Sequence, residues 1–525
     1  MLISKLHLPV LWRNNFVHRT CCLFLRLATT ATNVNDGFPT DLKPFSAIPG
    51  PSGLHKIPYV GTALLFKPFT QYDESEVGKM IAAQFKRYGD IIKLRMGRDY
   101  WVVLNHPDYA KTVLQANYEQ HKRLKLDLPV LIKKRTGRPL GLPSLEGKEW
   151  AALRKPAQEK MLRPAVVSNY VPLIEKVTND FITRLKQKDK IEDLLQELGK
   201  YTTESVGMLC FNRKLNSFDD TAEITAASLM SKLFELLQQS LITPFKTFLY
   251  FKTKLYRDYE EVDSQFLKIV DRELISQKEF LKKLKEEGKL NEYLDKEPNF
   301  MHSLLSDPRV THEDACSLVF DLFGAGIDST ANSMVFLLVH IAMNPDKQQQ
   351  LYQEIQRVVG DSNALTKEHL AQMSYLKACV KESFRKVSPI LLGTIRFLES
   401  DLAVGGYHLP KETLVAINMQ TMCSDERFFP RPNEYLPERW LRDTTGDIGK
   451  GQEYPFALKP FGFGSRSCVG QRFAENEIFI GVTKIIQNFE ISMPPGFKDV
   501  QATSKIFTSP AEKVVLHLKQ RNASP

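Results

Sequence analysis

The chain has 525 residues, 43% of them hydrophobic, which is enough for two or three average domains or for one large enzyme domain with a sizeable core. Lys and Arg exceed Asp and Glu by 71 − 61 = 10, which suits an anionic partner or a membrane surface, but no basic run interleaved with aromatic residues favours nucleic acid. The seven scattered cysteines lack any CxxC spacing, which argues against a disulfide framework or a zinc cluster.

The N-terminal segment lacks acidic residues, because the first acid of the chain is Asp36. Basic residues stand at positions 5, 13, 19 and 26, and this composition is typical of a mitochondrial transit peptide. A membrane anchor or a signal peptide is the rival interpretation, but these charges leave no apolar run near the ~18 to 20 residues that span a bilayer. We therefore expect a transit peptide over residues 1–35.

The elements predicted beyond this segment are mainly helical, with a minor β part. Alternating β-favouring residues predict a hairpin around Gly97 to Asp99, and residues 107–387 have a mostly helical pattern. A second hairpin is predicted in "LAVGGYHLPKETLVAINM", followed by a loop-rich stretch, a last helix over Gln471 to Asn488 and C-terminal strands such as "KVVLHL". No internal repeat interrupts this order.

The segment "LITPFKTFLYFKTKL", from Leu241 to Leu255, mixes aromatic residues with lysines. One interpretation is a set of core aromatics beside exposed lysines. The other is a membrane-facing patch, because aromatic and basic side chains together favour the bilayer interface.

One long helix is predicted to begin after Thr311, which is a suitable N-cap with Asp314 three residues on, and to end before Pro345. About 32 residues at ~1.5 Å each give ~48 Å, enough to cross a whole domain. Its centre, "GAGIDST", contains several residues that disfavour helix, so something must compensate. Close helix packing at the small residues is one explanation.

A single cysteine, Cys468, lies in the glycine-rich turn "PFGFGSRSCVGQRF". The glycines at positions 462, 464 and 470 permit unusual dihedrals and a close approach of the backbone to a flat object. A helix starting after Cys468, with Arg466 nearby, favours the thiolate form. The candidate roles are a nucleophile, a zinc ligand and the axial ligand of haem iron.

The order FxxGxxxCxG, formed by Phe461, Gly464, Cys468 and Gly470, resembles the haem-thiolate loop of the cytochrome P-450 family. The resemblance covers nearly all of residues 45–518. It implies a single catalytic domain over residues 36–525, with a long central helix over haem b, a cysteine-ligand loop and small β-sheets. Cys468 would bind the iron, and the enzyme would insert one oxygen atom of O2 into a lipophilic substrate.

Further positions match the family one by one. Trp150 and Arg154, four residues apart on one helix, are similar to the haem-propionate helix, and Arg396 and Arg466 match propionate-binding arginines. Two carboxylates call for several fixed guanidinium groups. The family's buried Glu-Arg-Arg cluster would be formed by residues with a structural role: Glu382, Arg385 and Arg439.

The centre of the long helix resembles the family's oxygen-activation segment. Asp328 would relay protons, and a neighbouring hydroxyl would hold the water that carries them; this sequence has Ser329 where threonine is usual, so either Ser329 or Thr330 supplies the alcohol. The resemblance also implies a substrate pocket on the face of this helix that includes Phe320, Phe323 and Ala325.

Lys377 and Lys381, at i and i+4, are similar to the docking pair for an acidic 2Fe–2S ferredoxin in mitochondrial members of the family, with Arg472 as a further docking residue. Electrons would come from NADPH through a ferredoxin reductase, and the enzyme would contact the matrix side of the inner membrane peripherally. The alternatives are a microsomal-type enzyme served by a diflavin reductase, or a haem sensor or carrier without oxygenase chemistry. A sterol, a secosteroid and a xenobiotic remain open as substrates.

Overall fold

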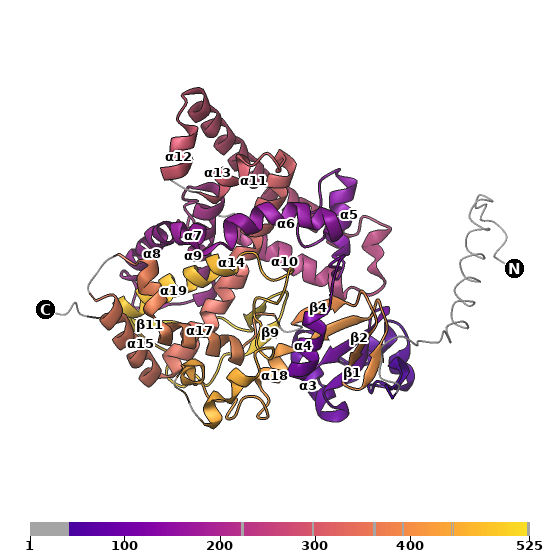
Figure 1. Cartoon of the computed structure of the whole chain (residues 1–525). Helices are drawn as coiled ribbons and strands as arrows, with labels where there is room; N and C mark the ends of the chain where they lie inside the picture. Colours follow the sequence, from indigo (N-terminus) through magenta and orange to yellow (C-terminus); the bar gives the residue numbers. More distant parts are fainter. Residues whose placement is uncertain are drawn as a thin grey trace, which may run out of the picture.

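Helices make up most of the computed structural model, which describes residues 41–521 apart from 222–224, 297–298, 361–363, 391–392, 443 and 445 (Figure 1). The predicted transit peptide lies outside the described residues. The α-helices are α2 (Val60–Ala63), α3 (Val77–Tyr88), α4 (Pro107–Gln115), α5 (Asp127–Arg135), α6 (Gly147–Met161), α7 (Pro164–Val167), α8 (Val171–Leu185), α9 (Leu194–Phe211), α10 (Ala226–Ile242), α11 (Lys254–Glu286), α12 (Leu290–Lys296), α13 (Phe300–Leu305), α14 (His312–Met343), α15 (Pro345–Val358), α16 (Lys367–Gln372), α17 (Ser374–Lys386), α18 (Met419–Cys423) and α19 (Gln471–Asn488).

The strands form four small sheets. They are β1 (Ile91–Met96), β2 (Asp99–Leu104), β3 (Lys190–Ile191), β4 (Thr394–Phe397), β5 (Leu402–Val404), β6 (Tyr407–Leu409), β7 (Leu414–Ile417), β8 (Phe489–Ser492), β9 (Ala502–Ser504), β10 (Thr508–Pro510) and β11 (Leu516–Gln520). The largest sheet has the order β1-β2-β7-β4, in which β2 and β7 are parallel and the other pairs antiparallel. Both predicted hairpins are present, as β1-β2 and as β5-β6, while β7 crosses to the largest sheet.

The helix α14 runs through the centre of the helical body. The side-chain oxygen of Thr311 accepts a hydrogen bond from the Asp314 amide and the Asp314 side chain caps in return, so the predicted capping box is present. Among the described residues, α14 is the one helix with the length and apolarity of a membrane span, and most of that stretch is buried inside the protein, as expected of a core helix.

Glycines let other helices approach α14 closely. A Cβ atom added at Gly326 would come within 2.9 Å of Val206 on α9, and one at Gly324 would overlap Met230 on α10. The explanation of the small residues by close helix packing is therefore correct for these two glycines.

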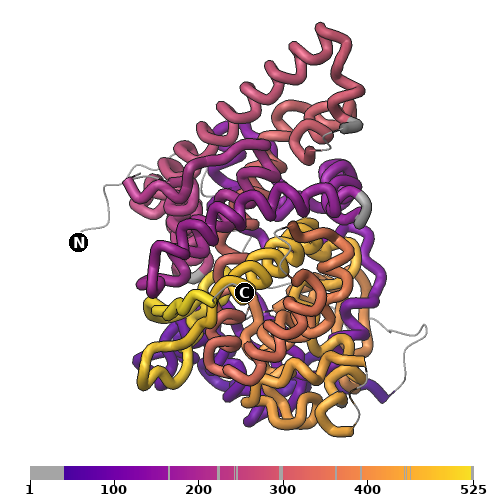
Figure 2. Tube along the Cα trace, turned by 90° about the vertical axis from the view of Figure 1, so that its left-hand side faces the viewer, coloured from indigo at the N-terminus to yellow at the C-terminus, as the bar shows by residue number. Residues whose placement is uncertain are grey.

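The largest sheet and the helical body lie on opposite sides of the molecule, with β1 and β2 at the lower right of Figure 1. The long helix α11 projects from the top of the body in both views (Figures 1 and 2). Helices α6, α14, α17 and α19 approach one another near the centre, and the loop before α19 carries Cys468 there.

Candidate active site

The turn that carries Cys468 is closed by a hydrogen bond from its amide to the carbonyl of Phe461, at 2.8 Å. Gly462 and Gly464 have φ angles of +75° and +76°, so these two positions favour glycine. Gly470 has an ordinary φ of −86° and precedes the first turn of α19, so the expected unusual dihedral is wrong at this third glycine.

The Cys468 side chain is exposed and lines a cavity of about 480 Å³ that lies between α6, α14, α19 and strand β4 of the largest sheet. Desolvation raises the pKa of its thiol above the ordinary value, while the amides of Gly470 and Gln471 and the charges of Arg154 and Arg123 oppose that effect. The prediction that the protein environment alone favours the thiolate is therefore wrong, because desolvation outweighs the helix terminus. Coordination to a metal ion deprotonates a thiol outright.

Four arginines surround the same cavity: Arg123, Arg154, Arg396 and Arg466. Three of them donate hydrogen bonds of 2.8 to 3.0 Å to backbone carbonyls of the cysteine loop, from Arg123 to Arg466, from Arg154 to Ser467 and from Arg396 to Phe463. The fourth, Arg466, donates to the carbonyls of His121 and Leu142 and stacks on the Trp150 ring at 4.1 Å. Distant elements thus hold the loop through guanidinium groups.

Among the described residues, none of these four guanidinium groups has a carboxylate partner. Burial, with repulsion from Arg123, lowers the pKa of Arg396 to about 10 and that of Arg466 to about 9. Burial also lowers the pKa of Arg154 to about 10. Uncompensated buried charge of this kind calls for a bound anion. The residues present would fit a dianionic haem, because the Cys468 sulfur could bind its iron and the arginines could bind its carboxylates.

Arg123 was not found from the sequence. It belongs to the loop between α4 and α5, which has no helical or strand pattern, and only the tertiary structure brings it within 3.0 Å of the Arg466 carbonyl.

The central part of α14 forms the wall of the cavity opposite the cysteine loop. Ala325, Ser329 and Thr330 line the cavity, whereas Asp328 does not. The Ser329 hydroxyl donates to the Ala325 carbonyl at 2.6 Å, a bond within the helix that occupies its proton.

Asp328 lies on the side of α14 that faces α10. Its carboxylate accepts a hydrogen bond of 3.1 Å from Ser231. The positive charge of Lys505, in the C-terminal segment, acts to lower the pKa of this carboxyl group. Burial raises the pKa of Asp328 to about 6, so the group exchanges its proton near neutral pH.

A second buried acid, Glu477 on α19, lines the cavity and was also missed. Neither of its carboxylate oxygens makes a well-formed hydrogen bond to a described residue, although the hydroxyls of Ser205 and Thr330 lie close enough to act against the effect of burial on its pKa. Burial dominates and raises the pKa of Glu477 well above the ordinary value, so these surroundings favour the protonated acid. Phe473 and Glu477 at i and i+4 line the cavity together, and an acid on an apolar helix face was the available signal.

Two of the predicted pocket residues do not reach the cavity. Phe323 is fully buried and packs edge-on against Phe211 and face-on against Phe266 of α11. Phe320 also packs against Phe266. Both residues are part of the core between α9, α11 and α14, so only Ala325 of the predicted three faces the cavity.

Glu382 lies in a fully buried ionic cluster beside the cavity. Arg385 donates two hydrogen bonds to its carboxylate, at 2.8 and 2.9 Å, and Arg439 donates a third at 3.2 Å. The indole of Trp440 adds a fourth at 3.0 Å. The structure brings together the three residues expected to cluster and adds a tryptophan that the sequence did not indicate.

The lysines of α17 differ in their availability. Lys381 and Arg472 are exposed. Lys377 is half-buried, and its amino group donates to the Ala371 carbonyl at 2.7 Å. Lys381 is therefore the freer charge of the pair.

In the aromatic segment after α10, one side chain fits the interpretation as core and two fit the interpretation as an exposed patch. Phe248 is buried, whereas Tyr250 and Phe251 are 75% and 70% exposed, next to the exposed Lys252 and Lys254.

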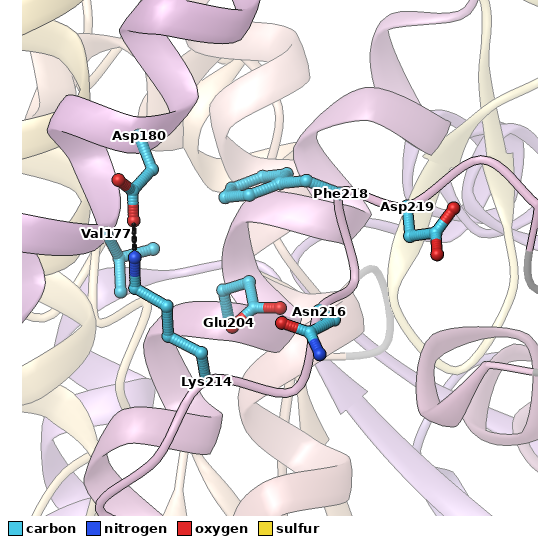
Figure 3. Close-up of a pocket in the computed structure, with 7 residues that line it drawn as sticks. All are labelled: Val177, Asp180, Glu204, Lys214, Asn216, Phe218 and Asp219. Atoms are coloured by element: carbon cyan, nitrogen blue, oxygen red, sulfur yellow. Dashed lines mark ion pairs between the residues drawn. The ribbon is translucent and has the colours of Figure 1, made fainter.

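A second, smaller pocket of about 320 Å³ lies between α8, α9 and the loop after α9 (Figure 3). Its charged groups have partners: Lys214 pairs with Asp180 at 2.5 Å, and Glu204 accepts from the amides of Leu215 and Ser217. With these groups satisfied, the pocket offers no reactive group comparable to Cys468.

A family model described as "Cytochrome P450" matches residues 51–518. The chain is 30% identical to "Cytochrome P450 10" of Lymnaea stagnalis, over 92% of this chain and 87% of the relative. It is also 30% identical to "Probable cytochrome P450 12a5, mitochondrial" of Drosophila melanogaster, over 88% of both chains. The "1,25-dihydroxyvitamin D(3) 24-hydroxylase, mitochondrial" of Rattus norvegicus is 27% identical over 85% of this chain and 84% of its own length.

Proposed function

The chain belongs to the cytochrome P450 family, whose members are haem-thiolate monooxygenases, and from that premise we propose that it is a mitochondrial hydroxylase of a sterol-like lipophilic substrate served by a ferredoxin. The substrate R–H becomes R–OH, and the second atom of O2 leaves as water with two electrons and two protons supplied to the site. The haem b of the family supplies the chemistry that activates O2.

In this proposal, Cys468 would bind the haem iron and the four cavity arginines would bind the haem carboxylates, while Trp150, Phe461 and Gly470 would shape the same site. The observation that carries it is the convergence of one cysteine sulfur and four carboxylate-free guanidinium groups on a single cavity. Three of these arginines also hold the backbone of the cysteine loop, so the groups that would bind the cofactor also position Cys468.

Protons reach the cavity through residues of α14 and its neighbours. Asp328 faces Ser231 outside the cavity, and its pKa of about 6 lets it take up protons near neutral pH. Thr330 is our choice for the alcohol that passes them on, because it lines the cavity beside the buried acid Glu477, whereas the Ser329 proton is held by the Ala325 carbonyl.

The substrate class rests on the apolar residues of the cavity and on the relatives named as mitochondrial enzymes, one of them a vitamin D hydroxylase. Val206, Leu209 and Phe507 are among the apolar side chains that face the cavity. We further propose that the exposed Tyr250 and Phe251, with their neighbouring lysines, rest on the membrane from which such a substrate arrives.

An absorbance titration of the purified ferric protein with sterols, secosteroids and unrelated xenobiotics tests the substrate class. We expect a spin-state shift at low concentration with one sterol class. Weak shifts with many unrelated compounds would contradict the sterol proposal and indicate a detoxifying enzyme.

The electron donor is tested with the substrate that shifts the spin state. We expect turnover with NADPH, ferredoxin reductase and a 2Fe–2S ferredoxin. Turnover supported only by a diflavin reductase would identify the microsomal type instead.

A further inference from the structure

Three potential metal ligands meet between α11 and the first turns of α14, away from the cavity. They are Asp271 on α11, and His312 and Cys316 at i and i+4 on α14, and their ligand atoms all lie within 4.8 Å of one another. All three side chains are half-buried, and none of them lines the cavity. The missing CxxC spacing argued against a zinc cluster, but these three ligands come from two helices, and 41 positions separate Asp271 from His312.

The distances between these atoms match those around a tetrahedral ion. With bonds of about 2.3 Å from zinc to sulfur and about 2.0–2.1 Å to nitrogen or oxygen, tetrahedral angles give ~3.3 Å between N and O and ~3.6 Å from S to either. The observed separations are 3.3 Å from His312 Nε2 to Asp271 Oδ1, 3.6 Å from Cys316 Sγ to His312 Nε2, and 3.7 Å from Cys316 Sγ to Asp271 Oδ1. The three ligand atoms are therefore already spaced as they would be around a zinc ion.

A nucleophilic Cys-His-Asp arrangement does not account for this geometry. Such a relay uses the two ring nitrogens of the histidine, one toward the nucleophile and one toward the acid. Here the same atom, His312 Nε2, faces both Cys316 and Asp271, and Nδ1 has no hydrogen-bond partner among the described residues. The contact of 3.3 Å between His312 Nε2 and Asp271 Oδ1 is also longer than a good hydrogen bond between nitrogen and oxygen.

The charges agree with a divalent cation. A thiolate and a carboxylate neutralise its two positive charges, and the imidazole binds as a neutral ligand. The Cys316 sulfur is within electrostatic reach of the negative charge of Glu313 and of the positive charge of Lys278 on α11. Mixed sulfur, nitrogen and oxygen ligands favour zinc over magnesium or calcium, which prefer oxygen alone.

We propose that Asp271, His312 and Cys316 bind one zinc ion, with the fourth coordination position open to water. The ion joins the middle of α11 to the start of α14 and so fixes the long projecting helix to the central one (Figure 1). Because the site is separate from the cavity, its occupation does not depend on the proposed function.

The test is a zinc titration of the haem-loaded full chain against a chromophoric chelator, with X-ray absorption at the zinc edge. We expect one tightly bound equivalent, with a sulfur neighbour at about 2.3 Å and nitrogen or oxygen neighbours at about 2.0 Å. His312→Ala, Cys316→Ser and Asp271→Asn should each weaken binding at least about tenfold. The matched controls Asp258→Asn on α11 and His369→Ala on α16 should bind as the unchanged protein does.

Zinc binding that is the same in the three ligand variants and in the controls would overturn the proposal. A sulfur neighbour that persists in Cys316→Ser would also overturn it, because the thiolate would then come from another cysteine. A wild-type spectrum without sulfur decides against the site even where a variant fails to fold.

Discussion

The sulfur of Cys468 has surroundings that oppose each other. Desolvation raises the pKa of the free thiol, while two backbone amides and two guanidinium groups act in the other direction. The thiol is therefore prepared for deprotonation by a bound metal rather than for independent reactivity.

Cys468→Ala should abolish the thiolate-type absorbance spectrum of the carbon monoxide complex, because no other described cysteine faces the cavity. Ser465→Ala, at an exposed position of the same turn, should retain it. A variant at 468 that keeps the thiolate spectrum would remove the ligand assignment.

Asp328→Asn should change the pH dependence of stability. The raised pKa of about 6 means that the folded state binds more protons than the unfolded state between about pH 4 and pH 6, so this group makes the free energy of unfolding fall as pH rises through that window. The amide removes this effect, so the variant should gain on the order of 1–3 kcal/mol relative to wild type at pH 8, and little at pH 4.5.

Urea unfolding of both proteins at pH 4.5 and pH 8 measures this gain. Asp99→Asn, at the exposed first residue of β2, provides the control and should show the same small difference at both pH values. Equal stability changes for Asp328→Asn at the two pH values would contradict the assignment of a protonated aspartic acid.

At the scale of the element, α17 depends on the cluster around Glu382. Replacing this glutamate by alanine leaves two fully buried arginines without their carboxylate, which should lower the free energy of unfolding by about 3–5 kcal/mol. Chemical unfolding measures the loss, and Glu426→Ala on the surface is the matched control. A loss below about 1 kcal/mol would mean that the cluster does not support the core.

Elements with a strong local signal could be predicted closely. The cap of α14 depends on Thr311 and Asp314, which are neighbours in sequence, and α19 begins and ends where its apolar pattern does. Helix phase also explains the error at Phe323, because it lies two positions, or about 200°, from Ala325 and so faces the opposite side. Arg123 could not be assigned, because its neighbours come from segments far apart in the chain. Glu477 had a local signal, as an acid on an apolar helix face, but its neighbours Ser205 and Thr330 come from distant segments.

At the scale of the whole molecule, the proposed docking surface lies on the exposed side of α17 and at the start of α19. Lys381→Glu should weaken the binding of a 2Fe–2S ferredoxin and make the rate less sensitive to salt, since the interaction is electrostatic. Lys377→Glu should have the smaller effect, because its amino group is held by the Ala371 carbonyl.

Ferredoxin affinity and the spin-state response to substrate are measured on the same samples. The double reversal Lys282→Glu with Lys283→Glu, on the exposed end of α11, controls for net charge. An unchanged ferredoxin affinity in Lys381→Glu would rule out the proposed docking site. Loss of the spin-state response to substrate would show that the substitution also disturbs the cavity.

The four guanidinium groups around the cavity also bear on how the protein matures. Without an anion between them they repel one another, and three of them hold the backbone of the cysteine loop. Chain folding and cofactor insertion are thus linked, because the dianion that neutralises these groups stabilises the state that binds it. We therefore expect the amount of folded chain to follow the supply of haem, because chain without the cofactor would be less stable and more open to proteolysis.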